Sequence, residues 1–189
     1  MSLFEFLVTL YSIVTGLGLT LLIRSLGQML ETRRKTRLYW VHTCWLAIML
    51  VSYVIVWFQL WSYRNVPSWT LLEGLLLLSV PIALYLVSHL AVPELEDGAE
   101  HDMRSYYYDH HRLLQGLLAL AVVLSTLAAG LILDRWTPGE SWLLVRLVAL
   151  AVLLPGIVSR RPQVHAAQVV VLMILLSFAV AELRRPITE

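Results

Sequence analysis

The sequence contains little charge and almost no cysteine. Only 14% of the 189 residues are charged and 59% are hydrophobic, whereas an average soluble domain is about 25% charged. So few charges cannot cover the surface of a soluble domain, which disfavours both a soluble enzyme and a disordered chain. The single cysteine, Cys44, excludes an internal disulfide and a cysteine-rich metal site. A net charge of +1 offers no basic face to a nucleic acid. The remaining class is an integral membrane protein.

Six segments are apolar over nearly the length that a membrane helix needs, which is about 20 residues. Leucine outnumbers β-branched residues in these segments, and none shows the strict alternation of a barrel strand. The sequence therefore predicts an all-α, polytopic membrane helix bundle with one transmembrane domain over residues 1–189. The predicted spans, of which the last two are short, are 3–23, 39–61, 71–90, 113–133, 142–158 and 164–180.

The basic residues of the loops predict how the bundle is oriented. Nine of the 14 basic residues fall in the first, third and fifth loops, and four fall on the opposite side. The positive-inside rule places the nine in the cytoplasm, so both termini are expected outside. With this orientation the spans form three hairpins, and three acids mark the starts of the odd-numbered spans: Glu5, Glu73 and Glu140. Either the hairpins are a pseudo-repeat, or these acids simply complement helix dipoles.

The first span carries small and polar residues at helical spacing. They share one face of a helix and comprise Glu5, Thr9, Ser12, Gly16 and Thr20. One interpretation is a polar stripe that lines a pore. The other is tight helix packing, within the bundle or at an oligomer interface, because small residues let helices approach closely.

Arg146 lies about one turn inside the fifth span. An arginine within a membrane span is a functional candidate. The alternative is that its side chain extends outward to the interface, or forms a structural ion pair with one of four acids near the same membrane boundary: Glu5, Glu73, Asp134 and Glu140.

All six histidines fall in the half that is expected to be cytoplasmic, and four of them come from different spans at similar depth: His42, His89, His111 and His165. Neutral imidazole is a ligand for haem iron and for divalent metals, so these residues are candidates for a cofactor site. The alternative is that they form hydrogen bonds with headgroups or loop carbonyls at the membrane interface.

The third loop, residues 92–112, is acidic with a balance of −4. Its carboxylates are able to bind a divalent cation, but pairing with the basic first loop is the favoured interpretation. Three consecutive tyrosines, Tyr106 to Tyr108, are expected to anchor the end of this loop at the interface.

Three stretches together carry a resemblance. They begin at Phe4-Glu5-Phe6, at Arg37-Leu38-Tyr39-Trp40 and at Arg104-Ser105-Tyr106. Their order resembles that of a group of small, uncharacterised bacterial integral membrane proteins with about six helices. The resemblance covers the first four spans and implies a bacterial inner membrane, but it implies no activity.

Three functions follow as hypotheses, and no motif indicates an enzyme. The first is a homo-oligomeric ion channel or small-solute transporter, with the polar stripe as its lining and Glu5, Glu73 and Arg146 at its outer mouth. It is favoured because polar groups in a membrane are costly and tend to mark a path. The second is a redox, metal or haem protein that uses the histidines. The third is an accessory or assembly subunit of a membrane complex.

Overall fold

A computed structural model describes residues 3–31, 36–91, 101–134 and 141–182. Apart from two strands of two residues each, this part of the chain is helical, which confirms the all-α prediction. The six helices are α1 (Leu3–Glu31), α2 (Trp40–Gln59), α3 (Leu71–Ala91), α4 (Met103–Leu133), α5 (Ser141–Val158) and α6 (Pro162–Glu182). A 3-10 turn, η1 (Leu60–Tyr63), continues α2.

Five of the helices, all except α5, are long and apolar enough to cross a membrane. Helix α5 has 18 residues, which corresponds to about 27 Å and falls short of a hydrocarbon core of about 30 Å. The predicted count of six spans is therefore not confirmed. The five long helices define a multi-pass helical membrane protein, which was the class predicted from composition.

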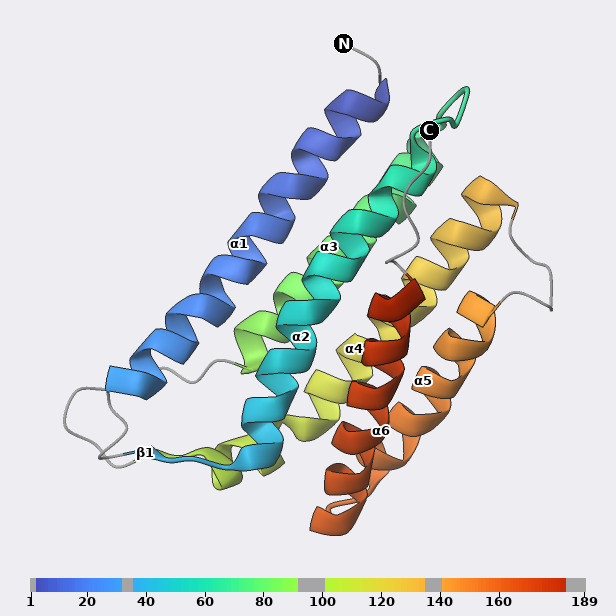
Figure 1. Cartoon of the computed structure of the whole chain (residues 1–189). Coiled ribbons are helices and arrows are strands. Elements are labelled where there is room, and N and C mark those ends of the chain that lie inside the picture. The colour runs from blue at the N-terminus through green and yellow to red at the C-terminus, as the bar shows by residue number, and fades with distance from the viewer. Residues whose placement is uncertain (1–2, 32–35, 92–100, 135–140, 183–189) are drawn as a thin grey trace.

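Consecutive helices run in opposite directions, so N-termini and C-termini of helices lie together at each end of the bundle (Figure 1). Helix α3 packs on α1 and α4, α4 packs on α5, and α6 closes the bundle against α5 and α2. Helix α1 lies at the edge of this arrangement (Figure 1). Most of its circumference is therefore uncovered by other helices.

Helix α4 begins ten residues before the predicted span, so the third loop is shorter than expected. Asp102 caps it, because its carboxylate accepts hydrogen bonds from the backbone N–H of Arg104 at 2.9 Å and of Ser105 at 3.4 Å. The three tyrosines therefore lie inside the first turns of α4 rather than before it.

The first and third loops do meet, but through their backbones. Strand β1 (Thr36–Arg37) pairs in parallel with strand β2 (His101–Asp102). Four of the six acidic residues of the third loop, within 92–100, and the basic run within 32–35 lie outside the described residues. The predicted charge pairing between these loops is thus neither confirmed nor contradicted.

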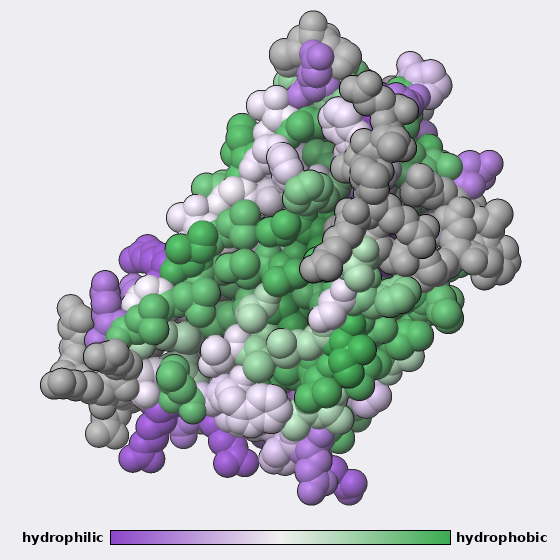
Figure 2. Space-filling view, in the orientation of Figure 1, coloured by the Kyte–Doolittle hydropathy of each residue, from purple (hydrophilic) through white to green (hydrophobic). Residues whose placement is uncertain are grey.

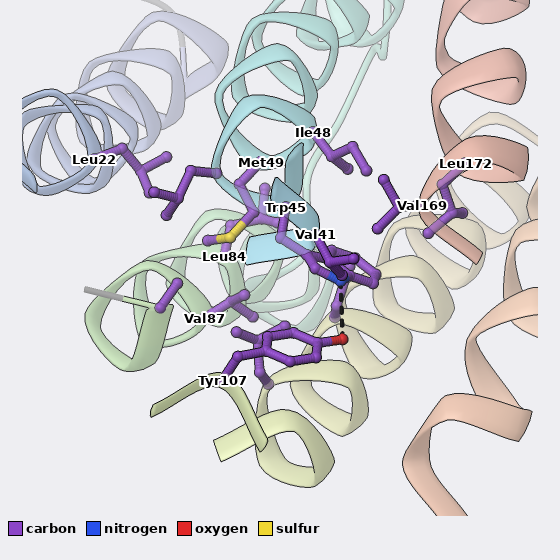
Figure 3. Close-up of a cluster of buried hydrophobic side chains, with 14 of the residues drawn as sticks. Leu22, Val41, Trp45, Ile48, Met49, Leu84, Val87, Tyr107, Val169 and Leu172 are labelled. Carbon is purple, nitrogen blue, oxygen red and sulfur yellow. Dashed lines mark hydrogen bonds between the residues drawn. The ribbon is translucent and has the colours of Figure 1, made fainter. Parts of the chain in front are cut away.

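The core is a continuous set of apolar side chains centred on α2, α3 and α4. Figure 3 shows Trp45 of α2 above Tyr107 of α4, with Leu84 and Val87 of α3 beside them. Many large apolar side chains also remain on the outside, where they form a broad hydrophobic belt with hydrophilic residues towards its ends (Figure 2). A lipid environment accounts for this belt, because exposed apolar patches of this size are rare in water.

Candidate functional site

Two groups of polar side chains lie inside the bundle, towards opposite ends of α5. We call the first the histidine cluster; its members are Trp45, Tyr107, His111, Gln115, His165 and Gln168. We call the second the arginine cavity; Arg146 lines it with Tyr11, Gln59, Tyr63 and Ser125.

Tyr107 is the centre of the histidine cluster. Its hydroxyl oxygen lies 3.0 Å from Nε1 of Trp45, 3.1 Å from Nε2 of Gln115 and 2.8 Å from Nδ1 of His165. The indole nitrogen and the amide nitrogen can only donate. The tyrosine oxygen therefore accepts from these two groups, and its own O–H is left for the histidine.

The other ring nitrogen of His165 fixes the tautomer. Nε2 lies 2.8 Å from the backbone carbonyl oxygen of Ser159, which is only an acceptor, so Nε2 carries the proton. Nδ1 is then an acceptor, and the hydroxyl of Tyr107 donates to it. Both nitrogens of His165 are occupied, which leaves neither of them for a metal in this arrangement.

Gln115 of α4 and Gln168 of α6 extend this network to α5. Their amides pair reciprocally at 3.3 and 3.4 Å, and Nε2 of Gln168 donates to the carbonyls of Val152 and Leu153 at 2.6 and 3.2 Å. A Cβ at Gly156 would overlap both amides, so only glycine permits this approach. The amides therefore fasten α4 and α6 to α5 just before Pro155, where the helix lacks a backbone N–H.

The structure brings three of the four candidate histidines together. The rings of His111 and His165 lie 5.3 Å apart, and His42 lies 6.4 Å from the ring of Tyr107. His89 is exposed on α3 and is not part of this group. The described residues contain no set of three or more His, Cys, Asp or Glu side chains arranged to hold a metal ion.

His42 and His111 each bond a backbone carbonyl through one nitrogen. His42 Nε2 lies 2.9 Å from the oxygen of Ala91, and His111 Nδ1 lies 2.7 Å from the oxygen of Tyr108. The second nitrogen of each ring is buried and has no hydrogen-bond partner. Since the first nitrogen donates, the second is an unprotonated acceptor. These carbonyls belong to helices α3 and α4, so the predicted bonds to loop carbonyls are not found for these two residues, whereas His165 does bond a carbonyl outside the helices, that of Ser159. A metal or haem site stays a prediction.

Sequence reasoning missed Tyr107, Gln115 and Gln168 as members of the network. Two amides within apolar spans were the available signal, because an amide in a membrane needs partners. The partners themselves depend on how the helices are rotated, which hydropathy does not specify.

The predicted polar stripe lies on the outside of the bundle. Glu5, Thr9, Gly16 and Thr20 are exposed, and Ser12 is half-buried, accepting a hydrogen bond from Trp57 at 3.3 Å. The hydroxyls of Thr9 and Thr20 donate to carbonyls of their own helix. This face therefore lines no path within a single chain, while its role as an oligomer face or a shared pore stays a prediction.

Glu73 has a local partner. Its carboxylate accepts from the backbone N–H and the hydroxyl of Thr70 at 2.7 and 2.8 Å, and Thr70 Oγ1 accepts from the N–H of Glu73 at 3.3 Å. This reciprocal pair is a capping box that starts α3. Glu73 thus stabilises a helix end.

Arg146 enters the interior from α5. One Nη donates to Oε1 of Gln59 at 3.2 Å, and the guanidinium lies 4.9 Å from the ring of Trp142. The other terminal nitrogen, Nη1, is buried without a hydrogen-bond partner. In the part of the chain that the structure describes, no acidic side chain forms an ion pair with Arg146, so the predicted structural pair with Glu5, Glu73 or Asp134 is not found, and the fourth predicted partner, Glu140, lies outside the described residues.

A cavity of about 20 Å³ adjoins this guanidinium. Such a volume accommodates about one water-sized species. Its polar lining consists of three hydroxyls and one amide: Tyr11, Tyr63, Ser125 and Gln59. A charged donor, neutral hydroxyls and no carboxylate make this lining suitable for an anion.

Comparisons with protein-family models, with curated proteins and with solved structures returned no match. The protein is thus placed by its own features as a multi-pass helical membrane protein with two internal polar sites.

Proposed function

We propose that the protein is a small-anion channel or transporter, and that the arginine cavity is the place where the anion binds. The observation that carries this proposal is the buried Nη1 of Arg146, which has no hydrogen-bond partner. The guanidinium lines a cavity of atomic size. Within the described residues this guanidinium has no counter-charge, and a buried charge without one is strongly unfavourable in a membrane. A monovalent anion such as chloride would supply the missing partner.

A series of buried hydroxyls on the core face of α1 supports passage in addition to binding. Tyr11, Thr15 and Ser25 are all at most 3% exposed, and the side-chain oxygens of Thr15 and Ser25 have no hydrogen-bond partner. Between them Tyr53 approaches Gly18 and pairs with Ser88 at 3.0 Å. From Tyr11 to Ser25 the series covers about 21 Å along the helix, which is most of a bilayer core. These groups lie on the face opposite the stripe that sequence reasoning selected.

Chloride efflux from liposomes that contain the purified protein tests this proposal. We expect Arg146→Gln to reduce the rate about tenfold or more, because a hydrogen bond to a charged group is typically worth that much. Arg160→Gln is the matched control, since Arg160 is exposed just beyond the other end of α5 and its substitution is expected to leave the rate unchanged. Thr15→Val is expected to slow efflux while retaining chloride binding.

Two results would contradict the proposal. One is wild-type protein that passes neither chloride, fluoride nor nitrate. The other is equal loss of efflux in Arg146→Gln and Arg160→Gln. A visible spectrum and metal analysis of the same preparation test the redox or haem alternative, which the unpartnered nitrogens of His42 and His111 keep open.

A further inference from the structure

An apolar groove opens between the start of α1 and the end of α2, and it shares one lining residue, Leu60, with the arginine cavity. Its volume is about 700 Å³, which lies in the range of small-molecule sites. We call it the aromatic groove; its walls are formed mainly by Phe4, Val8, Trp57, Phe58 and Trp61, with Arg64 at one end.

The groove has an apolar body that is closed towards the middle of the bundle. Phe4 and Val8 lie one turn apart on α1, and Ser12 lies one turn further on the same face. There Ser12 accepts the hydrogen bond from Nε1 of Trp57 in α2. This contact joins the two walls, so the groove extends for roughly 12 Å from Phe4 before it ends.

The open end of the groove carries a positioned cation. Arg64 donates to the carbonyl of Trp61 at 3.3 Å, and its guanidinium lies 4.9 Å from the ring of Trp61. These contacts leave further N–H groups of the guanidinium available. No ion pair with an acidic side chain engages Arg64 within the described ranges.

We propose that the aromatic groove binds an anionic phospholipid, with an acyl chain between the aromatic walls and the phosphate on Arg64. Tryptophans such as Trp57 and Trp61 typically lie at the headgroup level of a bilayer, which places Arg64 where lipid phosphates are. Guanidinium binds phosphate through two parallel hydrogen bonds. A second copy of the chain fits less well, because an apolar slot with one cationic end matches an amphiphile.

Native mass spectrometry of delipidated protein tests this site with two probes of equal chain length, dioleoyl phosphatidylglycerol and dioleoyl phosphatidylcholine. We expect the wild type to bind phosphatidylglycerol about fivefold more tightly, which is the effect of one arginine near an anionic headgroup. Arg64→Gln is expected to abolish this preference. Arg24→Gln changes an exposed arginine near the other end of α1 and should preserve it.

A second variant tests the body of the groove independently. Val8→Trp fills the space between the walls and should weaken the binding of both lipids, with unchanged transport of chloride if the arginine cavity is intact. Equal binding of the two lipids by the wild type would overturn the proposal. So would an equal loss of preference in Arg24→Gln, or a dimer whose contacts protect Trp57 and Trp61 in the absence of lipid.

Discussion

The two internal polar sites differ in charge and in how completely their hydrogen bonds are formed. At the centre of the histidine cluster, Tyr107 and His165 are neutral, and every polar atom of their side chains is engaged. In the arginine cavity, a permanent charge has one hydrogen-bond partner and one buried nitrogen without any. Since a buried polar group is stable only when it is satisfied, the centre of the first site can serve as a structural joint by itself, although Nε2 of His111 in the same cluster is buried without a partner. The second needs something else, which is why we assign ligand binding to it.

The largest expected effect concerns the joint itself. Gly156→Ala adds a Cβ that overlaps the amides of Gln115 and Gln168, and both amides must then move away from each other. Overpacking together with the lost hydrogen bonds is expected to lower the free energy of unfolding by about 2–4 kcal/mol. Thermal unfolding in detergent measures this change.

Gly116→Ala is the matched control for this prediction. Gly116 lies next to Gln115 in α4, and a Cβ there meets no atom within 4 Å. The substitution should leave stability unchanged or slightly higher, because alanine favours a helix over glycine. Equal destabilisation by both variants would show that the close approach at Gly156 has no special importance.

The second effect is smaller and tests whether the neutral network contributes to stability. Tyr107→Phe removes the oxygen that accepts from Trp45 and Gln115 and donates to His165. Two buried donors lose this acceptor, so we expect a loss of about 1–2 kcal/mol in the same unfolding experiment. Tyr108→Phe removes a hydroxyl whose one hydrogen-bond partner among the described residues is Tyr39, and it should cost less. The reverse order of the two variants would contradict a joint centred on Tyr107.

Much of the fold could be predicted from the sequence, but the sites could be predicted only in part. Five spans could be predicted from runs of apolar residues, because a helix that crosses a membrane needs a continuous apolar run of about 20 residues. The beginning of α4 could not be predicted in this way, because its first turns are polar and depend on the cap of Asp102. Residues 103–112 therefore resembled a loop.

The sites depend on how each helix is rotated, and hydropathy carries little information about rotation when both faces are apolar. On α1 the stripe from Glu5 to Thr20 looked like a path, whereas Tyr11, Thr15 and Ser25 are the residues that face the core. The grouping of the histidines, in contrast, could be predicted from their depth in the membrane without knowing how the helices are rotated. They lie near the ends of their helices on the same side of the membrane.

The third effect concerns the charged site, where removal of the side chain should not weaken the fold. Arg146→Met replaces an incompletely satisfied charge by an apolar side chain of similar length. In detergent without chloride we expect stability to be unchanged, or higher by about 1 kcal/mol, because such replacements of buried charges are often neutral or stabilising. Chloride is expected to raise the melting temperature of the wild type, and this increase should be absent in Arg146→Met.

Arg146→Lys is the companion variant, since it keeps the charge and should retain part of the response to chloride. A destabilisation of more than about 2 kcal/mol by Arg146→Met would mean that this arginine is structural like Tyr107. The distinction between the two sites would then be lost.

The smallest expected effect on stability is on the outer face of α1, which neither site uses. A side chain at Gly16 meets no atom within 4 Å, so Gly16→Cys, in a chain with Cys44→Ala, should change the stability by less than about 0.5 kcal/mol. If this face joins two copies, oxidation should give a disulfide-linked dimer in high yield, because small residues allow the backbones to approach to the distance that a disulfide requires. Leu17→Cys is the control, since Leu17 is also exposed but points about 100° away around the helix. Equal yields at the two positions, or none at either, would mean that the face contacts lipid and that any channel is built within a single chain.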